Sequence, residues 1–509
     1  MLKNVLDYLD NSVEKYPNKI AVADEHNSFT YSQLKEKAER IGAGLLNVTS
    51  PRMAVPVYMD KSCNALAIFM GAVSAGCFYV MLDPSHPVER INMILKTLGA
   101  TFMVVDEKSA KKQAKLGFTG KVLSVEELLE HEVTDKDKKM LLQIRQEALD
   151  IDPLYSIFTS GSTGVPKGVI VNHRSVIDFI DYFTSTFNIT DKDVIGNQAP
   201  FDFDVSVKDI YSTLSTGATM QIIPKKMFSF PTTLLDYLEE RKVTTLIWAV
   251  SALCIVTTLN GFEYKRPSAI NKVIFSGEVM PIKHLNAWRE QYPDAMFVNV
   301  YGPTEITCNC TYYIVDRNYE LDETLPMGKA FPNERVFLLD EEDKLIEPTM
   351  QGKIGEICVT GTAVTLGYFN NWEKTNQAFV QNPLNNKYNE IIYRTGDLGY
   401  YNNDGQLCFS SRKDFQIKHM GHRIELGEIE MAINAIDNVL RACCIFDKDA
   451  NKILGFYEGD TDKKTIMHEL MQKLPKFMIP SEFIQVEMPI TKNGKIDRNV
   501  LMENYKANK

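Results

Sequence analysis

The sequence lacks a long apolar segment and an excess of basic charge. No run reaches the roughly 18 uninterrupted apolar residues that a membrane-spanning helix needs. The start, Met1-Leu2-Lys3-Asn4, lacks the basic and apolar regions of a secretory signal. With 56 Lys and Arg residues against 66 Asp and Glu residues, the net charge of -10 argues against nucleic acid or an anionic membrane as a partner. We therefore expect a cytoplasmic protein.

Cysteine spacing gives no sign of a metal site or a disulfide framework. The nine cysteines are an odd number, and Cys308-Asn309-Cys310 and Cys443-Cys444 are too closely set for a zinc site. They are typical of reduced cytosolic thiols. Internal repeats and low-complexity segments are also missing. At 509 residues the chain exceeds one ordinary core, which predicts two or more domains.

Short apolar stretches alternate with helical periodicity along most of the chain. This alternation predicts an α/β fold with parallel-rich sheets covered by helices. The stretch 126–146 predicts one exposed helix. The expected strands include residues 54–58, 102–105, 219–223, 245–248 and 272–275.

The C-terminal part of the sequence predicts a separate small domain. After Arg412-Lys413-Asp414, an apolar stripe at helical spacing (Ile429, Ala432, Ile433, Ile436) begins a section whose size suits a small second domain. We expect a large domain over residues 1–413 and a small one over 414–509.

The segment from Phe158 to Gly168 combines hydroxyls, glycines and a lysine in a form suited to binding a polyphosphate. Gly161, Gly164 and Gly168 can take positive φ and let backbone N–H groups approach an anion, while Lys167 adds charge. The spacing differs from the Walker pattern, because Gly168 directly follows Lys167. Apolar runs at 155–158 and 169–171 predict strands that bracket the loop, which favours a phosphate site over a surface turn.

This loop resembles the ATP-binding signature of the adenylate-forming superfamily, which includes acyl-CoA synthetases, luciferases and the adenylation domains of nonribosomal peptide synthesis. Further matches follow in the family's order and span nearly the whole chain. They are residues 29–34, 75–84, 301–305, 355–357, 393–397, 421–428 and 493–498. The resemblance implies the fold of adenylate-forming enzymes, with a large N-terminal adenylation core and a small mobile α+β C-terminal domain.

The resemblance also implies a set of residues that bind ATP. The phosphates would be held by Thr159, Ser160, Gly161, Ser162, Thr163, Gly164 and Lys167, and the rest of the nucleotide by Tyr301, Gly302, Thr304, Asp397 and Arg412. In particular, Tyr301 would stack on adenine, and Asp397 would accept both ribose hydroxyls. Glu305 would help to hold Mg²⁺.

Two residues carry the expected motion and chemistry. Lys495 would stabilise charge on the carboxylate and the α-phosphate during adenylation. Asp414 would be the hinge about which the small domain rotates, carrying Lys495 away and bringing the Gly421 loop to the cleft for attack by a thiol. One departure is Ser411, where the family usually has glycine.

The acidic residue Asp204 indicates the substrate class. In amino-acid-activating members an aspartate here pairs with the substrate's α-ammonium group, whose burial without a counter-charge costs several kcal/mol. Aryl- and fatty-acid-activating members lack it. By register from the motifs, the substrate pocket would be formed by Asp204, Val205, Lys208, Ile247, Ile274, Ser276, Val300, Cys308 and Asn309.

Lys208 leaves two interpretations open. An ammonium group in the pocket floor suits an acidic or amide side chain such as glutamate, with Asn309 as a further hydrogen-bonding group. Alternatively, Asp204 and Lys208 form an exposed i,i+4 helix pair worth about 0.3 kcal/mol. Nearby segments are similar to the ligases that load D-alanine onto a carrier protein, but Ser276 stands where those ligases have cysteine.

The sequence shows neither a condensation motif nor a carrier-protein motif, so we expect a stand-alone enzyme. Its acceptor would be the phosphopantetheine thiol of a separate carrier protein. An acyl- or aryl-CoA ligase and a non-catalytic nucleotide sensor remain alternatives. Asp204 argues against the first, and the intact set Lys167, Glu305, Asp397 and Lys495 argues against the second.

Overall fold

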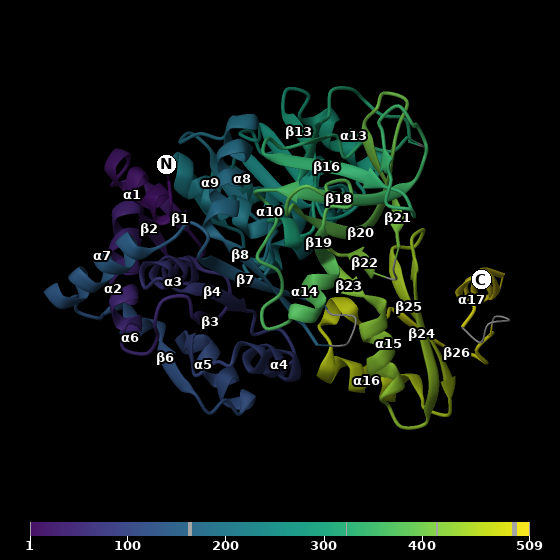
Figure 1. The fold of residues 1–509 in the computed structure, drawn as a ribbon, viewed down its shortest axis with the longest axis horizontal. Coiled ribbons are helices and arrows are strands. Elements are labelled where there is room, and N and C mark those ends of the chain that lie inside the picture. Colours follow the sequence, from purple (N-terminus) through teal and green to yellow (C-terminus); the bar gives the residue numbers. More distant parts are fainter. Residues whose placement is uncertain (1, 161–164, 322, 414–415, 491–495, 508–509) are drawn as a thin grey trace.

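The computed structural model describes residues 2–160, 165–321, 323–413, 416–490 and 496–507. These residues form five sheets. Figure 1 shows α1 (Leu6–Lys15), α2 (Tyr31–Leu45) and α7 (Asp135–Glu147) at one end, and the last part of the chain at the other.

A six-stranded sheet carries the phosphate loop at one edge. Its order is β6-β5-β3-β4-β7-β8; all neighbours are parallel except β7 and β8, which form an antiparallel pair. Helices lie between its strands along the chain. The strands are β3 (Ala54–Tyr58), β4 (Phe78–Leu82), β5 (Phe102–Val105), β6 (Lys121–Ser124), β7 (Pro153–Thr159) and β8 (Lys167–Asn172). Its helices are α3 (Cys63–Ser74), α4 (Val88–Leu98), α5 (Glu107–Gln113) and α6 (Val125–Leu129).

A nine-stranded sheet supplies most of the remaining core. Its centre is parallel, and β2, β14 and β15 at its ends are antiparallel to their neighbours. The strands are β1 (Ile20–Ala23), β2 (Ser28–Thr30), β9 (Val194–Asn197), β10 (Thr219–Ile222), β11 (Thr245–Ala249), β12 (Lys272–Ser276), β13 (Met296–Tyr301), β14 (Thr311–Ile314) and β15 (Lys329–Ala330). The helices between them are α8 (His173–Thr186), α9 (Val205–Thr216), α10 (Pro231–Glu240), α11 (Val250–Thr258), α12 (Gly261–Tyr264) and α13 (Ile282–Gln291).

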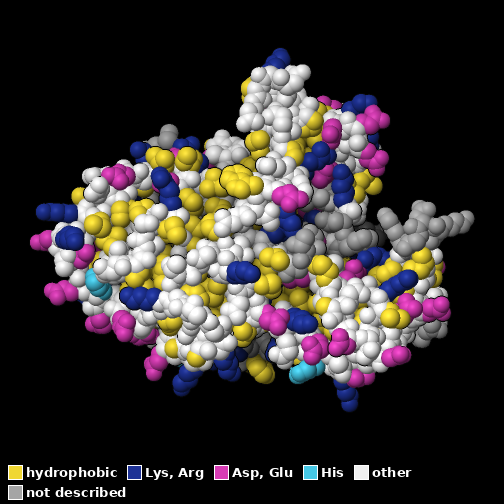
Figure 2. Space-filling view, turned by 60° about the horizontal axis from the view of Figure 1, so that its bottom comes forward, with side chains coloured by type: hydrophobic (Ala, Val, Ile, Leu, Met, Phe, Trp, Pro, Cys, Tyr) yellow, Lys and Arg dark blue, Asp and Glu magenta, His cyan; other side chains and the backbone are white. Residues whose placement is uncertain are grey.

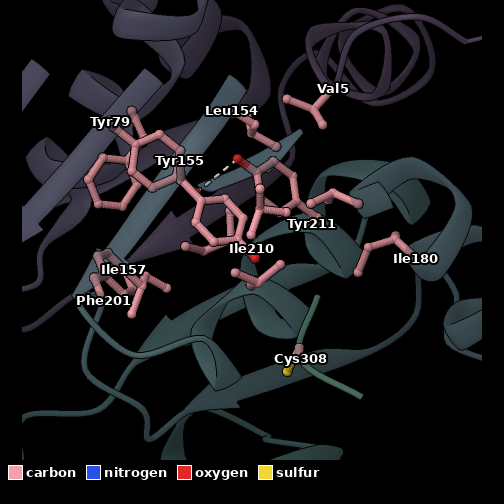
Figure 3. Packing of buried hydrophobic residues seen from close by; sticks show 14 of the residues in the cluster. Val5, Tyr79, Leu154, Tyr155, Ile157, Ile180, Phe201, Ile210, Tyr211 and Cys308 are labelled. Atoms are coloured by element: carbon pink, nitrogen blue, oxygen red, sulfur yellow. Dashed lines mark hydrogen bonds between the residues drawn. The ribbon is translucent and has the colours of Figure 1, made fainter. Parts of the chain in front are cut away.

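Helix α9 is packed into the centre of the molecule, with every residue from Val205 to Leu214 buried. It contacts α1, α8 and strands β9, β10 and β11. Figure 3 shows the aromatic packing beside it, where the hydroxyls of Tyr79 and Tyr211 lie 3.0 Å apart in a hydrogen bond and Tyr155 packs against Tyr79. A helix buried on all sides brings its polar residues into the core, where each needs a partner.

The third sheet is antiparallel, which the alternating pattern did not predict. It contains β16 (Glu334–Leu339), β17 (Leu345–Ile346), β18 (Gly355–Gly361), β19 (Phe379–Gln381), β20 (Ile391–Tyr401) and β21 (Leu407–Arg412), with α14 (Trp372–Ala378) beside it. Along β20, buried residues alternate with half-buried ones, as expected for a sheet covered on one face.

The C-terminal section, residues 416–507, has hydrophobic clusters of its own. Ile429 and Ile433 on α15 are fully buried in one of them, as the predicted apolar stripe requires. The section contains β22 (Gln416–His419), β23 (His422–Glu425), α15 (Leu426–Asn434), β24 (Val439–Asp447), β25 (Lys452–Gly459), α16 (Lys463–Lys473), β26 (Glu482–Gln485) and α17 (Arg498–Ala507).

The predicted α/β class and strand positions are confirmed, with two local corrections. The expected single helix over 126–146 is two helices, α6 and α7, because Thr134 and Asp137 form a capping box that starts a new helix. Gly168 lies inside β8 and does not take positive φ. Its small size is needed instead because a Cβ there would lie 2.7 Å from the Phe158 ring.

The surface agrees with the charge balance of the sequence. On the face seen in Figure 2, Lys and Arg side chains are interspersed with Asp and Glu and do not gather into a basic patch. Among the helices built from described residues, none is both long and apolar enough to cross a bilayer. Eight of the nine cysteines are buried and all nine are free thiols.

Candidate active site

A pocket lies where β22 and β23 meet the preceding part of the chain. Its wall brings together nine of the predicted site residues and adds several from the C-terminal section. The lining residues are Phe203, Asp204, Val205, Ser276, Gly277, Gly302, Pro303, Thr304, Cys308, Asn309, Asp397, Arg412, Gln416, Lys418, Gly421 and Arg423.

The flanks of the phosphate loop face the C-terminal section. Strands β7 and β8 pair Thr159 with Lys167 at one edge of the sheet, so the two ends of the predicted phosphate loop lie side by side there. Ser160 Oγ donates a hydrogen bond to the Arg423 carbonyl at 2.8 Å, and Lys167 Nζ lies 3.9 Å from Glu425 Oε1. Gly161, Ser162, Thr163 and Gly164 lie outside the described residues.

A tight turn after β13 positions several residues of the pocket wall. Thr307 and Cys308 take φ of 53° and 81°, a conformation that costs a residue with a side chain about 1–3 kcal/mol. Gly302 permits the turn, since a Cβ there would lie 2.5 Å from Asn309 Cα. Thr307 Oγ1 anchors it by donating to the Ala363 carbonyl at 2.7 Å. The turn thus holds Cys308 and Asn309 at the pocket wall.

Asp397 lies opposite Arg412 across β20 and β21, and the two side chains form an ion pair. The second carboxylate oxygen accepts a hydrogen bond from Tyr301 Oη at 2.5 Å. Lys418 Nζ lies 5.5 Å from the Tyr301 ring centroid. These groups form one cluster, so the carboxylate predicted to bind ribose and the ring predicted to stack on adenine are neighbours.

Glu305 is fully buried and neutralised by the C-terminal section. Arg423 Nη1 contacts one carboxylate oxygen at 2.6 Å, and Tyr368 Oη donates to the other at 2.7 Å. Burial alone raises the pKa of Glu305, but the charges of Arg423 and Lys167 and the Tyr368 bond outweigh it and lower the pKa to about 2. Glu305 is therefore ionised.

This arrangement does not fit Mg²⁺ on Glu305. Both oxygens of its carboxylate are engaged, and the adjacent guanidinium of Arg423 would repel a divalent cation. The predicted magnesium role of Glu305 stays a prediction for an arrangement in which Arg423 has moved away.

Asp204 precedes α9 but does not cap it. Its carboxylate turns to the pocket instead and accepts a hydrogen bond from Thr304 Oγ1 at 2.6 Å. Burial raises the pKa of Asp204, while the Thr304 bond and the positive charge of Lys208 oppose the rise. A buried carboxylate of this kind gains stability from a cation beside it.

Lys208 is fully buried, so the interpretation as an exposed pair with Asp204 is wrong. The cause is the burial of α9 on all sides, which sequence spacing does not reveal. Lys208 Nζ donates to Asn309 Oδ1 at 2.7 Å and Ser276 Oγ at 3.3 Å, both on residues of the pocket wall. Lys208 itself does not line the pocket but lies behind these two residues. Ile247, Ile274 and Val300, also predicted for the pocket, belong to the buried core on β11, β12 and β13 and do not line it either.

The structure adds site residues that sequence reasoning did not assign. Gln416, Lys418 and Arg423 reach the pocket from β22 and β23. Arg423 lies inside the family motif 421–428, and its place in that motif could have indicated a site residue. Asp414 and Lys495 lie outside the described residues.

A family model for AMP-binding enzymes matches residues 9–369. The chain belongs to the AMP-binding enzyme family. Among curated relatives of this AMP-binding enzyme, zwittermicin A synthase ZmaJ of Bacillus cereus is 31% identical over 97% of this chain and 93% of the relative. The D-alanine–D-alanyl carrier protein ligase of Staphylococcus haemolyticus is 30% identical over 99% of this chain and 100% of the relative. The chain covers 45% of tyrocidine synthase 1 of Brevibacillus parabrevis, at 30% identity.

Solved structures confirm the fold. Holo-PA1221, an NRPS protein containing adenylation and PCP domains, superposes with a TM-score of 0.82 at 21% identity, over 99% of this chain and 84% of that one. NpsA-ThdA, an artificially fused adenylation-PCP di-domain from Klebsiella oxytoca, gives 0.79 at 20% identity over 95% and 94%.

Proposed function

We propose that this AMP-binding enzyme activates an amino acid with ATP and transfers it to the phosphopantetheine thiol of a separate carrier protein. The first step forms an aminoacyl-adenylate and releases pyrophosphate. The second forms a thioester and releases AMP. The relatives named for a D-alanyl carrier protein ligase and for peptide synthases support this assignment.

Adenylation needs positioning and charge neutralisation more than proton transfer. An oxygen of the substrate carboxylate attacks the α-phosphorus, and the bond from that phosphorus to the pyrophosphate oxygen breaks. Lys167 would hold the phosphates and Asp397 the ribose, while Lys495 would stabilise charge that grows on the α-phosphate. Each of these roles is a proposal.

The observation that carries the amino-acid assignment is the buried carboxylate of Asp204 on the pocket wall. Among the described residues, this carboxylate accepts a hydrogen bond from the neutral hydroxyl of Thr304. An α-ammonium group entering the pocket would bring an opposite charge into direct contact with this carboxylate. A simple carboxylic acid would supply none and would leave this carboxylate buried at a cost.

We propose further that residues 414–509 form a small domain and that the arrangement seen here serves thioester formation. Strand β23 lies against the flanks of the phosphate loop, where Arg423 contacts Ser160 and Glu305 and Glu425 lies near Lys167. Because β23 contacts the residues that would hold the phosphates, pyrophosphate would have to leave before the C-terminal section takes this position. The free thiols support a place in the cytoplasm.

Exchange of labelled pyrophosphate into ATP tests the assignment. We expect exchange that depends on an α-amino acid when proteinogenic and D-amino acids are supplied one at a time. Exchange that needs a carboxylic acid without an amine, followed by thioester formation with coenzyme A, would establish the acyl- or aryl-CoA ligase instead. Exchange with neither class would refute adenylation.

A further inference from the structure

Lys208 is fully buried in α9, and its Nζ hydrogen-bonds only to neutral groups among the described residues. The two acceptors are Asn309 Oδ1 and Ser276 Oγ. Asp204 and Asp209 lie near enough for its positive charge to oppose the rise of their pKa values, but neither hydrogen-bonds to it. Burial of an ammonium group on neutral partners is costly, so a nearby anion would be bound favourably.

The hydrogen bonds of the two neighbouring carboxylates go to other groups, and Asp209 Oδ1 has no hydrogen-bond partner among the described residues. Asp209 Oδ2 accepts from Asn197 Nδ2 at 2.6 Å, and Lys61 Nζ donates to the same amide at 2.9 Å. Asp204 is the carboxylate that the proposed function gives to the substrate's α-ammonium group. Once the α-ammonium group is bound, the site holds three cations, namely this group, Lys61 and Lys208. Its two carboxylates, Asp204 and Asp209, balance only two of them.

Lys208 also fixes the polarity of the wall. Because Asn309 Oδ1 accepts from Lys208 and from Cys308 Sγ, the Nδ2 group of Asn309 is left to donate in another direction. Ser276 Oγ likewise accepts from Lys208, which leaves its hydroxyl proton to be donated elsewhere. Both residues line the pocket beside Asp204. The wall therefore offers N–H and O–H donors backed by a positive charge.

We propose that the substrate is an amino acid whose side chain ends in a carboxylate, recognised by Lys208 together with Ser276 and Asn309. This inference rests on the proposed function, since it assumes that Asp204 binds the α-ammonium group. A carboxylate there would accept from Ser276 and Asn309 on the wall, with the charge of Lys208 behind them, and would restore the charge balance. An aliphatic side chain would leave the donors and the ammonium without partners.

Calorimetric binding of aminoacyl-sulfamoyl-adenosines provides the test. We would titrate the glutamyl, aspartyl, glutaminyl and leucyl compounds into wild type, Lys208→Gln and Lys272→Gln. The glutamine keeps hydrogen bonds to Ser276 and Asn309 without the charge. The matched control removes a mostly buried lysine at the other end of β12, where Lys272 pairs with Asp193. Thermal unfolding of each variant checks the fold.

In wild type, an acidic compound should bind tightest. In Lys208→Gln its affinity should fall at least about 30-fold, with little change for the glutaminyl compound. Lys272→Gln should keep the wild-type order. Tightest binding of the leucyl or glutaminyl compound to wild type overturns the inference, even if a variant fails to fold. So does an unchanged order in a folded Lys208→Gln protein. If no aminoacyl compound binds and no amino acid supports exchange, the proposed function fails and takes this inference with it.

Discussion

The two ends of the pocket are built in different ways. The nucleotide end, comprising Lys167, Glu305, Asp397, Arg412 and Arg423, consists of charges in opposite pairs, two of which join the C-terminal section to the rest of the chain. The side-chain end, comprising Asp204, Lys208, Ser276 and Asn309, lies within one section and holds its charges on neutral partners. Rotation of the C-terminal section would change the first end and leave the second as it is. Variants at the two ends should therefore affect different properties.

Asp204→Ala should have the largest effect on amino-acid use. Loss of the partner of a buried ammonium group costs about 3–5 kcal/mol, so kcat/KM should fall at least about 100-fold for every α-amino acid. The KM for ATP should change little. Pyrophosphate exchange with each substrate varied in turn measures both.

Asp397→Asn is the matched variant at the nucleotide end. It should raise the KM for ATP and leave the ranking of amino acids intact. If Asp204→Ala and Asp397→Asn changed the same parameter, the division of the pocket into two ends would be wrong.

Lys495→Ala should raise the adenylation barrier by about 3 kcal/mol, by analogy with the loss of one oxyanion-hole donor. ATP binding should stay nearly intact because the lysine contacts charge that develops during the transfer. Rapid-quench measurement of adenylate formation and calorimetry with ATP separate the two effects. Near wild-type adenylation would remove this residue from its proposed role.

Arg423→Ala tests the link between the sections. The variant leaves Glu305 buried without its cation in the present arrangement, which should cost about 1–3 kcal/mol and slow thioester formation. Adenylation should be affected less. The control Arg394→Ala breaks an ion pair with Glu356 in the antiparallel sheet, away from the pocket wall. Equal losses in both half-reactions of Arg423→Ala would count against a rotating section.

Asp209→Asn should have the smallest effect on either half-reaction, and its effect should appear in the pH dependence of stability. Burial raises the pKa of Asp209 to about 7. Its contribution to stability is thus complete below its unfolded pKa of about 3.9 and is lost as the pH rises through about 7, with a slope of up to about 1.4 kcal/mol per pH unit. The variant should flatten this decline. Urea unfolding at about pH 4.5, 5.5 and 6.5, which lie between the two pKa values, measures the free energy of unfolding of both proteins. Parallel pH dependences for wild type and variant would contradict the prediction.

Features that depend on local sequence could be predicted. The apolar runs 155–158 and 169–171 gave the correct strands β7 and β8 because alternation and strand length are local properties. The antiparallel third sheet could not be predicted in this way, since strand direction depends on how the connections pack. The break in the expected helix over 126–146 was open to prediction, because the capping box that begins at Thr134 is visible in the sequence.

The side-chain end shows where prediction from sequence fails. Motif register predicted that Lys208, Ser276 and Asn309 belong to one pocket, and their hydrogen bonds bring them together. The burial of α9 is a tertiary property, however, and it decides between the two interpretations of Lys208. The contact of Arg423 with Glu305 joins residues 118 positions apart and has no local signal.

Competition between an amino acid and its deaminated analogue tests the central claim most directly. Wild-type enzyme would receive ATP with equal concentrations of glutamate and glutarate, and in parallel of alanine and propionate, and the adenylates would be identified by mass spectrometry. The account predicts aminoacyl-adenylate in excess in each mixture, because Asp204 requires an ammonium group. Predominant adenylation of glutarate or propionate would contradict it and favour the CoA-ligase alternative.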